Sequence, residues 1–207
     1  MIRYEYIFCD LDGPILDGKM RHYRCYSDIL EKYEKIPMAC DDYWNAKRKG
    51  TKLKGILEKS DFYDTELFMK EWIARIEEIH YLKYDVLKPN LVTALSYLKK
   101  RANKLCLLTL RKNYDNLIWE LQDKKIISCF DQILHHEISG KNAKCEILDK
   151  IYYDKALLIG DTELDIYTAE TMNCDFIGII NGLRTVDIFE NYVCFEEMID
   201  ICKMHYL

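Results

Sequence analysis

Short apolar runs alternate with helix-like stretches along most of this chain, and this alternation is the feature that most limits its fold. The strand-like runs cover residues 4–9, 104–110, 130–135, 156–159 and 176–180. Between them, apolar residues recur at helical spacing, for example at positions 91, 94, 95 and 98. Strands that alternate with helices are typical of a doubly wound parallel sheet, so the sequence predicts an α/β fold.

One long interruption breaks the alternation, because no strand-like run follows Leu16 until about residue 104. Two apolar stripes with helical spacing lie within it: Tyr23, Tyr26, Leu30 and Tyr33 in the first, and Phe68, Trp72, Ile76 and Ile79 in the second. We therefore predict a Rossmann-like core made of residues 1–16 and 86–207. A helical cap domain, residues 17–85, is expected to be inserted after the first strand.

Polar residues follow the predicted strands at their carboxyl ends, which is where open α/β sheets bind ligands. The first strand runs into IFCDLDGPILDG, residues 7–18, which places Asp10 and Asp12 there. Thr109 and Arg111 follow the second strand, and Asp161 and Asp165 follow the fourth. We expect these side chains to meet at one edge of the sheet.

Several carboxylates at one edge repel each other, by about 4 kcal/mol for two unit charges 4 Å apart at an effective dielectric of 20. A cation must offset this repulsion. The candidate ligands are all oxygen atoms, with no His or Cys nearby at metal-binding spacing. Such a set suits a hard ion that a phosphate group completes, and we therefore expect Mg²⁺.

A carboxylate can also attack phosphorus, which divides hydrolysis into two easier steps through an aspartyl phosphate. Asp10 is the candidate nucleophile. Asp12, two residues further along an extended segment, points to the same face and is the candidate acid and base. Thr109 and the neighbouring N–H groups of Leu110 and Arg111 would hold the phosphoryl oxygens, and a lysine would neutralise the transferring group.

Four motifs in this order resemble those of the haloacid dehalogenase-like superfamily, in its phosphatase branch. CDLDGPIL matches the family's D-x-D-G-[TP]-[LI], LCLLTL matches a Thr or Ser that ends a strand, and LLIGDTELD matches G-D-x-x-x-D. The third motif is a lysine ahead of a helix. The spacing is similar to that of capped members, with phosphoglycolate phosphatase-like proteins the nearest.

This resemblance implies a role for each matching position. Asp10 would be nucleophile and metal ligand, and Asp12 would be the acid/base that binds the metal through its backbone carbonyl. Thr109 would bind phosphate, and Asp161 and Asp165 would be acids of the metal site. Family members that cleave carbon–halogen bonds lack the second acid, so the presence of Asp12 disfavours dehalogenation.

Two positions leave the assignment open. The catalytic and phosphate-binding lysine is predicted to be Lys144, which begins the family-like run KCEIL, with Lys141 as the alternative. The residues after Thr109 depart from the family pattern: Leu110 replaces a frequent Asn, and Arg111 stands where many relatives have Lys, Ser or Gly. This departure blurs the subfamily and leaves the predicted chemistry unchanged.

Structural explanations compete for two further features. Asp165 with Thr162 forms a capping-box-like pattern at a helix start, which is compatible with a metal-site role. The basic run 47–55, which includes Arg48, is typical of a solvated face. The alternative is that it forms a clamp for a second anionic group of the substrate.

The sequence therefore predicts a magnesium-dependent phosphatase that hydrolyses a small phosphorylated metabolite through an aspartyl phosphate. A sugar phosphomutase of the same architecture is the alternative enzyme, because LKGIL, residues 53–57, is similar to the cap loop of such mutases. From another class, a catalytically silent phosphate-binding module or a receiver-like domain is the rival. Receivers are shorter, lack the helical insert and carry their nucleophile on a later strand.

Charge and composition exclude several other partners. A formal net charge of −5 and a pI near 5.6 disfavour nucleic acid and anionic membranes. The first residues are too short an apolar stretch for a signal peptide, and no run approaches the roughly 18 residues of a membrane span. Nine cysteines without a C-x-x-C pattern are typical of reduced thiols, so we expect a cytoplasmic protein, either a monomer or a weak homodimer.

Overall fold

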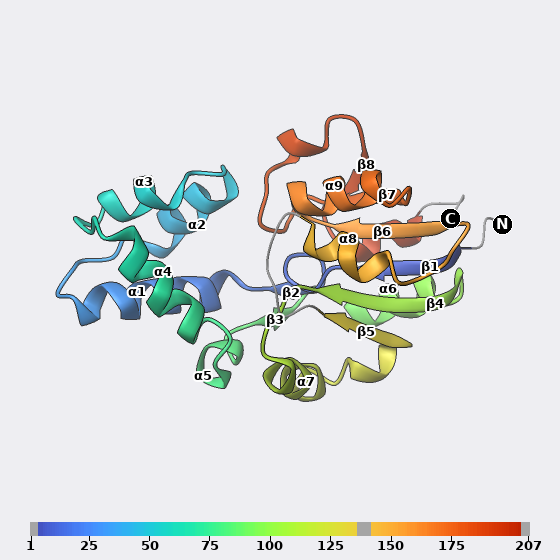
Figure 1. Cartoon of the computed structure of the whole chain (residues 1–207), viewed down its shortest axis with the longest axis horizontal. Coiled ribbons are helices and arrows are strands. Elements are labelled where there is room, and N and C mark those ends of the chain that lie inside the picture. The colour runs from blue at the N-terminus through green and yellow to red at the C-terminus, as the bar shows by residue number, and fades with distance from the viewer. Residues whose placement is uncertain (1–3, 136–141, 204–207) are drawn as a thin grey trace. The chain divides into compact units, whose positions relative to one another are not determined.

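The computed structural model describes residues 4–135 and 142–203 of the chain (Figure 1). The chain divides into two compact units, one formed by Met1–Asp17 with Leu87–Leu207 and the other by Gly18–Val86. Both boundaries fall one residue later than those placed from the sequence. The two connecting segments, β2 (Leu16–Asp17) and β3 (Val86–Leu87), pair in a two-stranded sheet.

The first unit contains a six-stranded parallel sheet, so the predicted doubly wound α/β fold is confirmed (Figure 1). Its strands are β1 (Tyr4–Cys9), β4 (Ala102–Thr109), β5 (Gln132–His135), β6 (Ala156–Gly160), β7 (Asp175–Ile179) and β8 (Val193–Phe195). Their spatial order is β5-β4-β1-β6-β7-β8. The chain thus builds outward from β1 on one side and then restarts at β6 on the other. The topological switch point, where such sheets bind ligands, lies between β1 and β6.

Helices cover both faces of this sheet, as the alternation of side chains along β1 requires. The helices of this unit are α6 (Leu91–Lys99), α7 (Tyr114–Asp123), α8 (Ala143–Leu148) and α9 (Glu163–Thr171), with short 3₁₀ segments η1 (Ile127–Cys129), η2 (Val186–Phe189) and η3 (Met198–Lys203). Ile7 and Cys9 pack in one core cluster with α6, α7 and η3, whereas Phe8 packs with α8 and α9 in another. Both clusters are buried, as expected for a parallel sheet that is covered on both faces.

The second unit is helical, with α1 (Lys19–Lys32), α2 (Cys40–Arg48), α3 (Leu53–Glu58), α4 (Thr65–Arg75) and α5 (Ile79–Leu82). Its core is aromatic: the buried Tyr26 ring stacks on Tyr43 at 4.2 Å and lies 6.2 Å from Phe68. A buried ion pair between Arg21 and Asp85, at 3.0 Å, joins the start of the unit to its end. None of the helices in residues 4–135 and 142–203 is long and apolar enough to cross a membrane.

Candidate active site

The side chains predicted from the strand ends do meet at one edge of the sheet. Cys9, the last residue of β1, pairs with Leu107 of β4 on one side and with Ile159 of β6 on the other. Asp10 and Asp161 therefore leave their strands side by side at the switch point, and Thr109 ends β4 close to the same level. The parallel register alone brings three distant parts of the sequence together.

The turn after β1 explains the glycine of the DLDG stretch. Gly13 has φ of +110°, a conformation that side chains other than glycine rarely adopt. A Cβ atom at this position would overlap the carboxylate of Asp161. The backbone N–H of Gly13 donates to the carbonyl of Leu16 at 2.9 Å, which closes the turn. The glycine is therefore needed both for the shape of the turn and for the close approach of Asp161.

Three buried carboxylates and one buried ammonium group form the centre of the site. Asp10, Asp161 and Asp165 each offer an oxygen within 4.8 Å of the others. Lys144, at 3% exposure, places Nζ 2.8 Å from Asp10 Oδ1 and 2.5 Å from Asp165 Oδ1. Of the two candidate lysines, Lys144 lies in this cluster, whereas Lys141 lies outside the described residues.

Asp165 is held from both sides. Its Oδ2 atom accepts hydrogen bonds from the backbone N–H groups of Asp161 and Thr162 and from the Thr162 hydroxyl, at 3.1, 3.0 and 2.7 Å. Together with Thr162 it forms the capping box at the start of α9 that the sequence pattern indicated. Because Lys144 contacts the other oxygen, Asp165 fixes both the lysine and the turn that carries Asp161.

Asp161 is fully buried, and its two oxygens differ. Oδ2 accepts a hydrogen bond from the backbone N–H of Leu183 at 2.5 Å, and Gly182 and Gly13 leave no room for any side chain beside it. Within the described residues, Oδ1 has no hydrogen-bond partner. A buried carboxylate oxygen without a partner is costly, so this atom is available to a ligand.

Burial shifts the pKa values of Asp10 and Asp161. Loss of water raises the pKa of the Asp10 carboxyl to about 7, with Lys144 opposing the shift and Asp165 adding to it. Burial, followed by the charges of Asp10 and Asp165, raises the pKa of Asp161 well above its usual range. Burial works to lower the pKa of Lys144, but its two carboxylate neighbours outweigh it and the pKa is raised.

This cluster fits a divalent cation. The cluster contains three carboxylates and one ammonium group, which leaves two negative charges uncompensated when all are ionised. The ligand atoms are oxygens, and one of them, Asp161 Oδ1, has no partner in the described structure. Hard cations prefer such oxygen ligands, so the site is suited to a divalent metal ion.

The end of β4 and the two residues that follow it carry further groups of the site. Thr109 is 1% exposed, and its hydroxyl accepts a hydrogen bond from the backbone N–H of Arg111 at 3.3 Å. Leu110 lies between them and is partly buried. The Arg111 side chain makes a bidentate pair with Asp12, with Nε to Oδ2 and Nη2 to Oδ1 both at 2.8 Å.

Sequence reasoning missed two residues of this site. Glu120 of α7 is fully buried, and its carboxylate lies 3.4 Å from Arg111 Nη2. Leu183 contributes only its backbone N–H to Asp161. Glu120 has helical spacing with Leu117 and Leu121, so its place on the buried face of α7 was visible in the sequence, whereas nothing in the sequence marks the backbone of Leu183.

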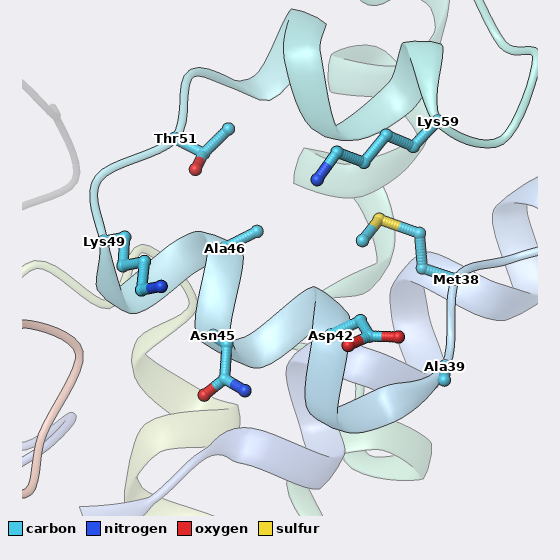
Figure 2. Close-up of a pocket in the computed structure, with 8 residues that line it drawn as sticks. All are labelled: Met38, Ala39, Asp42, Asn45, Ala46, Lys49, Thr51 and Lys59. Atoms are coloured by element: carbon cyan, nitrogen blue, oxygen red, sulfur yellow. The ribbon is translucent and has the colours of Figure 1, made fainter.

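Arg48 lies on α2, in the second unit, and its predicted role remains a prediction. A pocket of about 400 Å³ is also found in that unit (Figure 2). It is lined by Met38, Ala39, Asp42, Asn45, Ala46, Lys49, Thr51 and Lys59. In Figure 2 the Lys59 side chain extends toward Thr51 across the pocket. Lys49 and Thr51 belong to the basic run 47–55, so part of that run borders a concave surface.

The parallel sheet and the buried acidic cluster at its switch point define a doubly wound α/β protein with an oxygen-lined polar site. A model of the haloacid dehalogenase-like hydrolase family matches residues 6–179, and the chain belongs to this family. The family resemblance inferred from the motifs is thereby confirmed. No curated protein matches the chain.

Solved structures share the fold across nearly the whole chain. A predicted phosphatase from Clostridium acetobutylicum has a TM-score of 0.75 at 20% identity, covering 98% of this chain and 100% of its own. A predicted phosphoglycolate phosphatase from Haemophilus somnus has a TM-score of 0.75 at 16% identity, covering 98% of both chains. A haloacid dehalogenase-like family hydrolase from Streptococcus pneumoniae has a TM-score of 0.71 at 16% identity, covering 97% of both.

Proposed function

We propose that this protein is a magnesium-dependent phosphatase that hydrolyses a small phosphorylated metabolite through an aspartyl phosphate. One observation carries the proposal: the Asp10 carboxylate lies 2.8 Å from the buried Lys144 ammonium group, in a cluster with Asp161 and Asp165, at the switch point of the sheet. A nucleophile, a fixed positive charge and an oxygen site for a cation are the parts that phosphoryl transfer needs. Membership of a hydrolase family supports the same reaction class.

In the first half of the reaction, an Asp10 carboxylate oxygen attacks phosphorus. The bond between phosphorus and the leaving oxygen breaks, and that oxygen takes a proton from Asp12 as the alcohol departs. Lys144 neutralises negative charge on the transferring group, while the Thr109 hydroxyl and the N–H group of Leu110 hold its oxygens. The backbone N–H of Arg111 donates to the Thr109 hydroxyl. The product is an acyl phosphate on Asp10.

In the second half, the Asp12 carboxylate takes a proton from a water molecule. The water oxygen attacks phosphorus, the bond to Asp10 breaks, and inorganic phosphate leaves with the free carboxylate restored. Asp12 thus returns to its protonated state, and the balance over both halves is one ester and one water consumed for one alcohol and one phosphate released.

Magnesium would be held by the carboxylates of Asp10, Asp161 and Asp165 and by the backbone carbonyl of Asp12. The bound ion supplies positive charge that stabilises the phosphoryl oxygens and orients them for displacement. Asp161 Oδ1, which is buried and has no partner within the described residues, supports this assignment. Asp165 also acts indirectly, because it orients Lys144 and the Asp161 turn.

The substrate is proposed to be a small phosphorylated metabolite, and phosphoglycolate is a first candidate because a solved structure of similar fold is described as a predicted phosphoglycolate phosphatase. The helical unit is proposed to act as a cap over the substrate, with Arg48 as part of a clamp for a second anionic group. Nine free thiols suit a reducing compartment such as the cytoplasm.

The test is a hydrolysis screen of purified protein with MgCl₂ against p-nitrophenyl phosphate, phosphoglycolate, glycerol 3-phosphate and glucose 1-phosphate. We expect phosphate release by the wild type and its loss in Asp10→Asn, since an amide is nearly isosteric but a far poorer nucleophile. Asp123→Asn, at an exposed acid at the end of α7, is the matched control and retains activity. Magnesium-dependent release by Asp10→Asn refutes the assignment. Isomerised glucose phosphate without released phosphate identifies a mutase instead.

A further inference from the structure

The geometry points to Arg111 and Glu120 as positioning residues that act through Asp12, a role that rests on the proposed function. The sequence predicts Arg111 among the groups that bind phosphate. In the structure its guanidinium group makes two parallel hydrogen bonds with Asp12, Nε to Oδ2 and Nη2 to Oδ1, both at 2.8 Å. Such a fork fixes both the direction and the plane of a carboxylate.

The two residues of this pair differ in burial. The Arg111 side chain is 5% exposed, whereas that of Asp12 is 36% exposed. The arginine is therefore enclosed by the protein, and Asp12 is the member of the pair that remains accessible to solvent. Each carboxylate oxygen of Asp12 keeps a second lone pair after the fork forms, so a proton can be given or taken there.

Glu120 contacts the guanidinium group of Arg111 from the protein interior. It lies on α7 with a fully buried side chain, and its Oε2 atom is 3.4 Å from Arg111 Nη2. A buried carboxylate is costly unless a positive charge compensates it, so Glu120 requires Arg111 to stay in the core. The backbone N–H of Arg111 is anchored as well, since it donates to the Thr109 hydroxyl at 3.3 Å. The order of contacts is Glu120, Arg111, Asp12, from the core to the site.

The leaving group of the substrate distinguishes a residue that acts through the general acid from a residue that binds the phosphoryl group. A residue that acts through the general acid matters when the departing oxygen needs a proton, as for alkyl phosphates. It matters little for p-nitrophenyl phosphate, whose leaving oxygen is stable as an anion. A residue that binds the phosphoryl group is needed equally for both esters.

The experiment compares kcat/KM of the wild type, Arg111→Lys, Glu120→Gln and Asp12→Asn for p-nitrophenyl phosphate and for glycerol 3-phosphate and phosphoglycolate. General acids contribute about 10²- to 10⁴-fold, so we expect Arg111→Lys to lower kcat/KM at least about tenfold for the alkyl esters and less than about threefold for p-nitrophenyl phosphate. Glu120→Gln should show the same pattern with a smaller loss. Arg101→Lys, at the opposite end of β4, is the matched control.

A double-variant cycle sharpens the result. If Arg111 acts only through Asp12, Arg111→Lys causes no further loss on alkyl esters in the Asp12→Asn background. Equal losses on both esters, or additive losses in the cycle, overturn the inference and return Arg111 to phosphate binding. A wild type that hydrolyses no ester with magnesium instead contradicts the proposed function.

A measurement that needs no substrate tests the Arg111–Asp12 pair even if the wild type hydrolyses no ester or if a variant folds poorly. The ¹⁵N NMR signal of the Arg111 Nε–H group, assigned with Arg111→Lys, should shift and exchange faster with water in Asp12→Asn, because the fork is lost. Asp12 is partly exposed, so this variant is expected to fold. A signal that is the same in Asp12→Asn and in the wild type shows that no such pair exists, and the inference then fails whatever the activity.

Discussion

The ammonium group of Lys144 lies 2.8 Å from the carboxylate of Asp10, and both side chains are buried. Lys144 comes from α8, whereas Asp10 follows β1, so the contact joins two elements that are far apart in the sequence. The same Nζ atom lies 2.5 Å from Asp165, and one cation is thereby shared between two acids. This sharing makes the lysine important for both stability and the proposed chemistry.

Lys144→Met should be strongly destabilising and inactive. Removing one partner of a buried ion pair typically costs about 3–5 kcal/mol, because the remaining charge is buried without compensation. The free energy of unfolding from urea denaturation and phosphate release with MgCl₂ are the two measurements. Lys150→Met, at an exposed lysine after α8, should leave both nearly unchanged. Activity of Lys144→Met within threefold of the wild type would contradict the assigned role.

Gly13→Ala should impair the site even though it adds a single methyl group. The φ of +110° disfavours alanine, and the new Cβ would overlap the Asp161 carboxylate. Backbone strain alone costs about 1–3 kcal/mol, and displacement of Asp161 adds loss of metal binding. Gly50→Ala is the control, because Gly50 also has positive φ, +69°, but has open space around its Cβ position. Isothermal titration with MgCl₂ should show weakened binding for Gly13→Ala only; equal effects would argue against the overlap.

Stabilisation by magnesium should increase as pH rises through about 7. Burial raises the pKa of Asp10 from 3.8 to about 7, so without metal the folded state holds a proton that the unfolded chain releases. That contribution to stability is fully present below about pH 4 and is lost as pH rises through about 7. Metal binding requires the ionised carboxylates, so it competes with protons at low pH.

Thermal unfolding with and without MgCl₂, at about pH 6 and about pH 8, tests this expectation. The rise in Tm caused by the metal should be larger at the higher pH. Asp10→Asn removes one of the two acids with a raised pKa and should weaken this dependence. An equal magnesium effect at pH 6 and pH 8 in the wild type would contradict this expectation, because it would show that the acids are already ionised in the metal-free protein at pH 6.

The sequence predicted the centre of the sheet well because β1, β4 and β6 are mostly buried and read as apolar runs. β1 has the predicted limits, and the other predicted strands differ by one or two residues at their ends. The strand β8 was missed, because Val193–Phe195 is a short and only partly buried edge strand without such a run. β2 and β3 have only two residues each and depend on pairing with each other.

The sequence predicted those positions of the candidate site that follow directly from the ends of strands. It did not predict which side chains form hydrogen bonds or ion pairs with each other. Asp10, Thr109 and Asp161 follow strands, so the parallel register brings them together. The pairing of Arg111 with Asp12 and Glu120 depends on the path of the β4–α7 loop, which motif spacing does not describe. Nor does spacing reveal that Asp165 is hydrogen-bonded through both of its oxygens.

The ion pair between Arg21 and Asp85 should be the main polar contributor to the stability of the helical unit. Their side chains are 3% and 0% exposed, and the pair joins α1 to the segment that ends the unit. Asp85→Ala leaves Arg21 buried without this partner, so we expect a loss of about 3–5 kcal/mol in unfolding free energy. Asp41→Ala removes the partner of Lys19 in an exposed pair and should cost less than about 1 kcal/mol. Urea denaturation followed by tryptophan fluorescence compares them, since Trp44 and Trp72 both lie in this unit. Equal losses for the two variants would show that burial does not strengthen the Arg21 pair.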